Sequence, residues 1–115
     1  MKDLDSVIKR IRAFRDARDW MQFHNPKNLA ISISLEAGEL LEHFQWKSME
    51  ESEAHAKAAQ SKIAEEMADI AIYLFELADN LGIDILAAMN GKLQKNEKKY
   101  PVRKSRGSNK KYSEL

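Results

Sequence analysis

Four carboxylates occur in two pairs that have the same spacing. Glu36 and Glu39 stand three residues apart in "EAGE", and Glu66 and Asp69 stand three residues apart in "EMAD". On a helix, residues three apart are neighbours on one face, so each pair can point both carboxylates the same way. Hard divalent cations bind such oxygens, and Mg²⁺ combines a few carboxylates with water and substrate phosphates. The spacing is compatible with half of a metal site, and also with an ordinary solvated helix face.

The segments around the two pairs carry one apolar pattern, repeated after 30 positions. Apolar residues at helical spacing form one stripe in each segment: Leu29, Ile33, Ala37, Leu40, Leu41 and Phe44, then Ile63, Met67, Ile70, Leu74, Leu77 and Leu81. Helices with matching stripes pack as a hairpin, which would bring the four acids to one seam. Like charges at a half-buried seam repel each other and resist desolvation, so they need a compensating cation. The pattern alone leaves the metal site and the solvated face both open.

Other polar residues near the pairs fit this scheme less closely. Glu42 falls on another helix face, and we expect it on the surface. Glu65 could support the acids as a further carboxylate, and Glu76 lies two turns beyond the second pair. A di-iron bundle would need a Glu-x-x-His motif on each of two helices. His43 stands four residues after Glu39, and the third helix has no second histidine, so this motif is absent. We interpret His24 and His55 as lone histidines that do not bind a metal.

The elements that must position these residues are helices. Proline occurs only at positions 26 and 101, and helix-forming residues dominate between them. Pro26 suits the first turn of a helix, Gly82 suits a helix end, and Pro101 must follow one. We predict four helices, with a loop at 19–26 and a polar, partly helical segment at 47–60; the helices span about 4–18, 27–46, 61–80 and 84–99.

Composition excludes several kinds of chemistry. The 115-residue chain contains no cysteine, which rules out disulfides, thiolate zinc sites and cysteine nucleophiles. It has no Gly-x-x-x-x-Gly-Lys phosphate loop and no visible Ser-His-Asp or zinc motif. No apolar run approaches the roughly 18 residues of a membrane span, and "MKDLDSVIKRIRAF" lacks the apolar core of a signal peptide. We expect one folded domain in the cytoplasm, without a membrane partner.

Charge is distributed unevenly along the chain. The net charge is +1, but residues 90–115 carry nine basic and two acidic side chains, while the first 89 residues have a net charge of −6. An acidic body with a basic tail can reflect simple solvation or contact with phosphates. One interpretation is a solvated tail or a nonspecific polyanion patch, and the more specific one is a tail that contacts phosphates.

These residues match a known family. The sequence resembles the MazG-like all-α nucleoside triphosphate pyrophosphohydrolases, and more closely their dCTP pyrophosphatase subgroup, whose motif is Glu-x-x-Glu, a spacer and Glu-x-x-Asp. The flanking stretches agree as well: "RDWMQFHNPKNL" (18–29), "FQW" (44–46), "DIAIYL" (69–74), "KLQKNEKKYPV" (92–102) and "SRGSNKKY" (105–112). The resemblance implies a four-helix MazG-like bundle completed by oligomerisation. We place the catalytic domain at 1–100 and a basic C-terminal tail at 101–115.

The resemblance implies an activity and a cofactor. The activity is Mg²⁺-dependent hydrolysis of a nucleoside triphosphate between its α and β phosphates, which yields a monophosphate and pyrophosphate. The implied substrate is dCTP or a related pyrimidine deoxynucleotide, and the implied role is nucleotide-pool sanitation. Glu36, Glu39, Glu66 and Asp69 match the catalytic acids that bind Mg²⁺, for which Mn²⁺ is a possible substitute. The general base stays open between these acids and Glu65.

The resemblance also implies contacts with the substrate and with other subunits. Trp20, His24 and Trp46 match groups that line the base pocket. Tyr73 matches a position near the substrate. Lys92 matches a position that contacts phosphate, and Asn96 matches one that reaches the nucleotide. The family implies a homodimer or homotetramer, in which the tail residues Lys111 and Tyr112 could reach a neighbouring subunit's site. No nucleic acid is expected as a partner.

Two alternatives remain within what the sequence allows. A family member could prefer dUTP or other nucleoside triphosphates. A protein of another class could use the same helices as a non-catalytic nucleotide-binding or oligomerisation module, with the acids as a solvated face. A turnover assay distinguishes these alternatives.

Overall fold

The computed structural model describes residues 3–115, and these residues form helices and turns without a strand. They divide into two units, one ending at Gly82 and one beginning at Ile83. The first unit contains four α-helices and one short 3₁₀ helix: α1 (Leu4–Ala17), η1 (Met21–Phe23), α2 (Pro26–Glu42), α3 (Met49–Ala58) and α4 (Gln60–Asn80). The all-α prediction is confirmed for this part of the chain. No helix among the described residues is long and apolar enough to cross a membrane.

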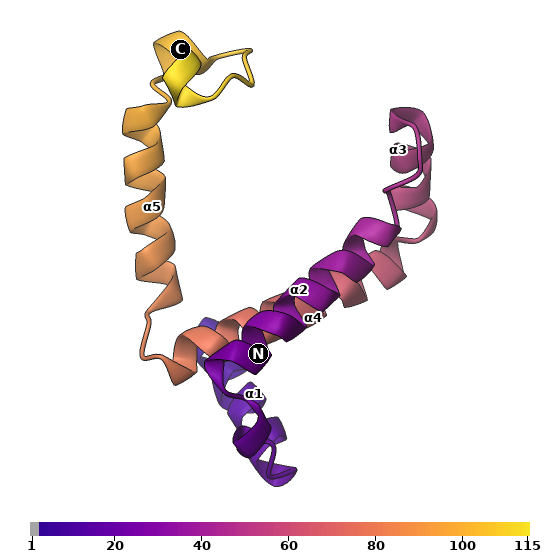
Figure 1. The fold of residues 1–115 in the computed structure, drawn as a ribbon, viewed down its shortest axis with the longest axis vertical. Helices are drawn as coiled ribbons and strands as arrows, with labels where there is room; N and C mark the ends of the chain where they lie inside the picture. The colour runs from indigo at the N-terminus through magenta and orange to yellow at the C-terminus, as the bar shows by residue number, and fades with distance from the viewer. Residues whose placement is uncertain (1–2) are drawn as a thin grey trace. The chain divides into compact units, whose positions relative to one another are not determined.

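Helices α2 and α4 lie side by side and form the main helix pair of the first unit (Figure 1). Leu29 on α2 is the most deeply buried large side chain, with 1% of its surface exposed, and Ala78 on α4 is buried as well. The predicted hairpin between the two acidic segments is therefore present. It places the Glu-x-x-Glu and Glu-x-x-Asp sequences on neighbouring helices.

Helix α1 is attached to the C-terminal part of α4 by arginines. Arg12 donates from Nε to Asp79 Oδ2 at 2.7 Å and from Nη2 to the other carboxylate oxygen. Arg15 donates from Nη1 to Asn80 Oδ1 at 2.9 Å, and Ile11, next to Arg12 in the sequence, is buried. Polar pairs therefore fix the register of α1 on α4.

Replacing Asp79 by asparagine should weaken this attachment in a pH-dependent way. The hydrogen bond from Arg12 is the largest cause that holds the pKa of Asp79 below its usual value. A carboxylate with a lowered folded-state pKa stabilises the fold above its unfolded pKa of about 4, and that stability is lost as pH falls through the folded value. In thermal unfolding, Asp79→Asn should have a lower Tm than wild type near neutral pH, and the difference should close in acid. A difference that stays constant down to about pH 2 would contradict this role.

Side-chain caps begin the helices where the sequence predicts starts. Asn25 accepts a hydrogen bond from the backbone N–H of Asn28 at 2.9 Å, and Pro26 occupies the first helical position. Asp84 caps α5 in the same way through the N–H of Ala87 at 3.0 Å. The loop before α2 is therefore held close to the helix that carries the first acidic pair.

The segment after the first acidic pair agrees with the prediction in part, since 47–60 is partly helical as predicted but the helix before it ends early. Helix α2 ends at Glu42 instead of residue 46, because the N–H groups of His43 and Phe44 bond to carbonyls three residues back and tighten the chain into a turn. The polar segment then forms α3, which begins with a capping box between Ser48 and Glu51. This reciprocal pair of hydrogen bonds supplies a helix start that apolar periodicity does not reveal.

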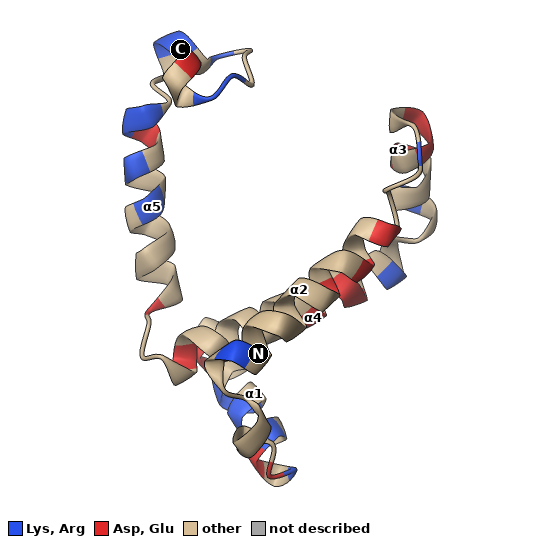
Figure 2. Ribbon diagram, viewed as in Figure 1, with Lys and Arg blue, Asp and Glu red and all other residues tan. Residues whose placement is uncertain are grey.

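The second unit begins with α5 (Ile85–Lys99) and continues into the tail with α6 (Val102–Ser105) and the 3₁₀ helix η2 (Tyr112–Glu114). The tail has more structure than its polar composition suggests, since the Tyr100 and Tyr112 rings meet edge to face at 6.0 Å. Lys99 Nζ lies 4.8 Å from the Tyr112 ring centre. Figure 2 shows Lys and Arg concentrated along the later part of this unit.

Many large apolar side chains are exposed on the single chain. Leu86, Met89 and Leu93 recur at helical spacing along α5 and are each more than half exposed. On the main helix pair, Leu35 and Met67 are 65% and 56% exposed. Apolar surface of this extent on regularly spaced helix positions is typical of a protein that buries it against a partner.

Candidate metal centre and adjoining pocket

Three of the four predicted acids converge between α2 and α4. Glu36, Glu39 and Glu66 each offer one carboxylate oxygen, and these oxygens all lie within 4.8 Å of one another. We call these three residues the acidic cluster. Asp69, one turn beyond Glu66, is not part of the cluster and instead lines a neighbouring pocket. The hairpin geometry therefore joins the two acidic segments, with Asp69 between the cluster and the pocket.

The electrostatics of the cluster suit a bound cation. Glu36 Oε2 is buried without a hydrogen-bond partner among residues 3–115. Burial is the main cause that raises the pKa of Glu36, followed by a hydrogen bond with Glu39 and by the nearby negative charges. The pKa of Glu66 is raised too, first by a hydrogen bond with Glu39. A divalent cation would supply the partner that this oxygen lacks and would compensate the repulsion among the carboxylates.

A histidine pair lies beside the cluster. His43 and His55 meet through Nδ1 and Nε2 at 2.8 Å, which joins the end of α2 to α3. His43 also lines a small cavity of about 360 Å³ together with Glu39, Glu42 and Glu66. Burial and the positive charges of Lys47 and His43 lower the pKa of His55. This pairing is not predictable from the sequence, because helical periodicity does not extend across the turn that separates His43 from His55.

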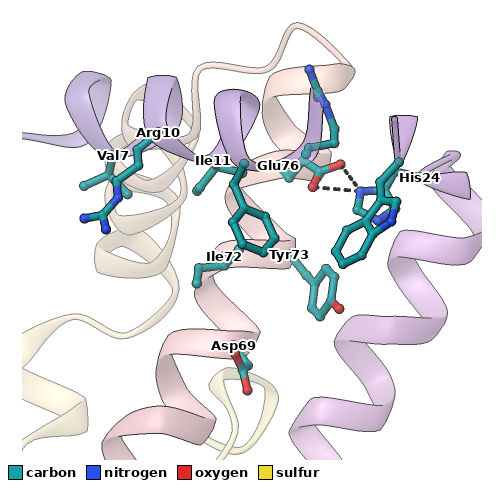
Figure 3. Close-up of a pocket in the computed structure, with 11 residues that line it drawn as sticks. Val7, Arg10, Ile11, His24, Asp69, Ile72, Tyr73 and Glu76 are labelled. Atoms are coloured by element: carbon teal, nitrogen blue, oxygen red, sulfur yellow. Dashed lines mark hydrogen bonds and ion pairs between the residues drawn. The ribbon is translucent and has the colours of Figure 1, made fainter. Parts of the chain in front are cut away.

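A larger pocket of about 610 Å³ opens between α1, the loop before α2, and α4. Figure 3 shows Val7 and Ile11 from α1 facing Ile72 and Tyr73 from α4, with His24 on the loop side. Its volume lies within the range of small-molecule sites, which are usually apolar with a few directed polar groups. The pocket is therefore suited to a ligand with one flat, weakly polar part.

Aromatic rings follow one another along this pocket. The Trp20 ring lies 6.1 Å from that of His24, and the His24 ring lies 6.4 Å from that of Tyr73, centre to centre. These are three of the six residues predicted to bind substrate. Burial is the largest cause that raises the pKa of Tyr73, and the charges of nearby acids add to it. The phenol therefore keeps its proton at neutral pH and can donate a hydrogen bond.

Polar residues that sequence analysis did not connect lie at one side of the pocket. Glu76 is 3% exposed, and its two carboxylate oxygens lie 2.7 and 3.0 Å from His24 Nδ1. Asn80 and the buried Arg15 continue this arrangement. Glu76 and Tyr73 are three residues apart, which places them on one helix face. This spacing, and the place of Glu76 two turns beyond Asp69, are sequence signals for Glu76, but they do not identify the histidine that it contacts.

Comparison with known proteins agrees with these features. A model of the MazG-like family matches residues 31–115, which includes both acidic pairs. The chain belongs to the MazG-like family. The match covers most of the chain, so the acidic cluster and the α2–α4 pair are those of a MazG-like protein.

Individual relatives extend the comparison to nearly the whole MazG-like chain. It is 44% identical over 111 residues to dCTP pyrophosphatase 1 from Bos taurus, which covers 94% of this chain and 66% of the relative. The same protein from Homo sapiens is 40% identical, with 94% and 65% covered. The chain thus spans about two thirds of the length of these curated relatives. A solved pyrophosphatase from Archaeoglobus fulgidus has a TM-score of 0.82 at 43% identity, covering 85% of this chain and 92% of that one.

The remaining predicted site residues of the MazG-like chain lie elsewhere. Trp46 follows the end of α2, is 88% exposed and does not line the larger pocket. Lys92 and Asn96 lie one turn apart on α5, in the second unit. Lys111 and Tyr112 belong to the tail. Their contacts with a nucleotide stay predictions.

Proposed function

We propose that this protein is a Mg²⁺-dependent nucleoside triphosphate pyrophosphohydrolase that converts dCTP or a related pyrimidine deoxynucleotide to its monophosphate and pyrophosphate. The observation that carries the proposal is the acidic cluster with the buried, unpartnered oxygen of Glu36 next to an aromatic pocket. The names of the mammalian relatives and of the archaeal pyrophosphatase support the reaction. The protein would remove deoxynucleotides from the cellular pool.

The pocket binds the base of the substrate, and the acidic cluster lies on the side of its phosphates. Trp20, His24 and Tyr73 hold the pyrimidine, because ring faces and edges give favourable contact with a flat base. Asp69 lines the pocket one turn from Glu66, so a nucleotide whose base occupies the pocket can extend its phosphates toward the acidic cluster. The triphosphate is thereby oriented before hydrolysis.

Glu36, Glu39, Glu66 and Asp69 are the residues that would hold the metal. When bound, Mg²⁺ or Mn²⁺ neutralises phosphate charge and lowers the pKa of a coordinated water. The carboxylates of this set, with Glu65, are the candidates that accept the proton of the attacking water. Tyr73 keeps its proton because burial and the surrounding acids raise its pKa, and it donates a hydrogen bond to the substrate.

The other predicted site residues supply the remaining substrate contacts, and exposed apolar side chains supply the assembly. Lys92 and Asn96 contact the nucleotide, with Lys92 on phosphate, and Trp46 closes the base pocket. The exposed apolar residues of α2, α4 and α5 are buried in a homodimer or homotetramer. In that assembly Lys111 and Tyr112 reach a neighbouring subunit's site.

We also propose a cellular location and a division of the chain. The protein acts in the cytoplasm on a free nucleotide, with neither nucleic acid nor a membrane as partner. The division into a catalytic domain at 1–100 and a tail at 101–115 also stays a proposal.

A substrate panel tests the proposed function. The rate of pyrophosphate release is measured for all common deoxynucleoside and ribonucleoside triphosphates and for modified dCTP, with Mg²⁺ and with Mn²⁺. We expect kcat/KM for dCTP or a modified dCTP to exceed that for purine nucleotides by at least about tenfold, the discrimination that one lost or mismatched contact provides. Equal kcat/KM values for purine nucleotides would contradict the proposed preference for pyrimidines. No hydrolysis with either metal would favour the non-catalytic binding module.

A further inference from the structure

The polar side of the larger pocket is a chain of four side chains from three segments. Arg15 on α1 donates from Nη1 to Asn80 Oδ1 at 2.9 Å, and Asn80 Nδ2 donates to Glu76 Oε2 at 3.3 Å. His24, in the loop before α2, places Nδ1 at 2.7 Å from the same Glu76 oxygen. Arg15 and Glu76 are both buried, at 8% and 3% exposed. This hydrogen-bond chain, Arg15–Asn80–Glu76–His24, ends on a residue that lines the pocket.

The direction of each hydrogen bond in this chain is fixed by chemistry. A guanidinium only donates, so the oxygen of the Asn80 amide must face Arg15 and its nitrogen must face Glu76. A carboxylate ion only accepts, so Glu76 accepts from Asn80 and from His24. The Nδ1 atom of His24 must therefore carry a proton. Nε2 is then the ring nitrogen that remains for a ligand in the pocket.

We propose that Glu76 is a positioning residue that holds His24 in its Nδ1–H tautomer, so that Nε2 accepts a hydrogen bond from the exocyclic amino group of a cytosine-type base. This proposal rests on the proposed function for the presence of a pyrimidine nucleotide. The amino group of cytosine is a donor, whereas the O4 atom of uracil or thymine at the same position is an acceptor. An accepting Nε2 therefore favours dCTP over dUTP.

The substitution Glu76→Gln should weaken this polarity with little change in shape. Asn80 donates to Oε2, so the carbonyl oxygen of the introduced glutamine takes the Oε2 position and its amide nitrogen takes the Oε1 position, 3.0 Å from His24 Nδ1. The negative charge that holds the proton on Nδ1 is then lost, and a donor lies beside Nδ1, so the neutral ring shifts toward the Nε2–H tautomer. In that tautomer the ring presents a donor to the pocket and favours the carbonyl group of a uracil-type base.

Two measurements on the full chain test the proposal. The ¹⁵N chemical shifts of the His24 ring, recorded without nucleotide, report the tautomer independently of turnover. Binding of dCMP and dUMP is then titrated, and kcat and KM are measured for dCTP and dUTP. For Glu76→Gln we expect a larger share of the Nε2–H tautomer than in wild type. We also expect a fall of about tenfold in the dCTP/dUTP ratio of kcat/KM, mainly through KM for dCTP, which corresponds to the loss of about one hydrogen bond.

Matched variants separate positioning from stability. Glu76→Asp keeps an acceptor and should retain the Nδ1–H tautomer and the preference for dCTP. Asp79→Asn removes a neighbouring α4 carboxylate that binds Arg12 and not His24, so it should lower Tm while leaving the dCTP/dUTP ratio unchanged.

The outcomes distinguish this proposal from the proposed function. An unchanged His24 tautomer in folded Glu76→Gln would overturn it, and so would a changed tautomer with the nucleotide preference within twofold of wild type. If the wild type hydrolyses no triphosphate, the proposed function fails, and the dCMP and dUMP affinities of wild type and Glu76→Gln still decide whether Glu76 sets the preference. Equal affinities in both proteins would overturn the positioning role.

Discussion

Glu39→Gln should reduce the Mg²⁺-dependent release of pyrophosphate from dCTP by at least about 100-fold. Losing a residue that only supports a metal ligand typically lowers metal affinity or activity about 10- to 100-fold, and losing the ligand itself should lower it more. Glu39 is the central member of the acidic cluster. Its carboxylate lies within 4.8 Å of those of Glu36 and Glu66, and its proximity raises the pKa of both. Glutamine keeps the shape of the side chain but removes the charge and most of the affinity for a hard cation.

The matched control is Glu53→Gln, which removes the same charge from an exposed α3 residue that belongs neither to the acidic cluster nor to the lining of the small cavity, whereas Glu42 lines that cavity. We expect its turnover to stay within about threefold of wild type, as for a surface change. Thermal unfolding supplies a second readout, since Mg²⁺ should raise the Tm of wild type and Glu53→Gln but not that of Glu39→Gln. Comparable rates for Glu39→Gln and wild type would show that the cluster is a solvated face.

Met89→Lys should dissociate the protein into subunits and lower its Tm strongly. Leu86, Met89 and Leu93 form an apolar stripe on α5 and are 52%, 51% and 56% exposed on the single chain. A lysine in the middle of a buried interface would place an uncompensated charge there, which costs several kcal/mol. Because the proposed assembly supplies substrate contacts from neighbouring subunits, we also expect turnover to fall at least about tenfold.

Sedimentation and light scattering measure this effect, and Ala88→Lys is the control. Ala88 is exposed and lies next to Met89 in the sequence, but roughly 100° around the helix from it. Lysine there adds the same charge away from the stripe and keeps a good helix former. A wild type that is monomeric at micromolar concentration, or a Met89→Lys variant that keeps the wild-type mass, would argue against the oligomer.

Local periodicity accounts for the features that the sequence predicted best. The repeated apolar stripes predicted that α2 and α4 pair, and the three-residue spacing predicted that Glu36, Glu39 and Glu66 come together. Both patterns depend only on the geometry of a helix and on the burial of one face. Asp69 has the same three-residue spacing but lines the pocket instead. It lies one turn beyond Glu66, and over that turn the surroundings of α4 change from the acidic cluster to the pocket.

The features that sequence analysis missed depend on contacts between distant segments. His24 and Glu76 are 52 positions apart, Arg15 and Asn80 are 65 apart, and His43 and His55 meet across a turn. Spacing within one helix cannot identify such partners. Helix α3 is different, because the segment 47–60 is predicted from the sequence to be partly helical. The Ser-x-x-Glu signal of its capping box at Ser48 and Glu51 is present in the sequence and marks the start that apolar periodicity does not.

The products of dCTP hydrolysis test the central claim most directly. Purified protein is incubated with dCTP and Mg²⁺, and the reaction is followed by ³¹P NMR, with EDTA and Glu39→Gln as parallel samples. We expect dCMP and pyrophosphate in equal amounts from the wild type, and neither product in the two parallel samples. Formation of dCDP and orthophosphate, or turnover that persists in EDTA, would contradict a metal-dependent pyrophosphohydrolase built on the acidic cluster.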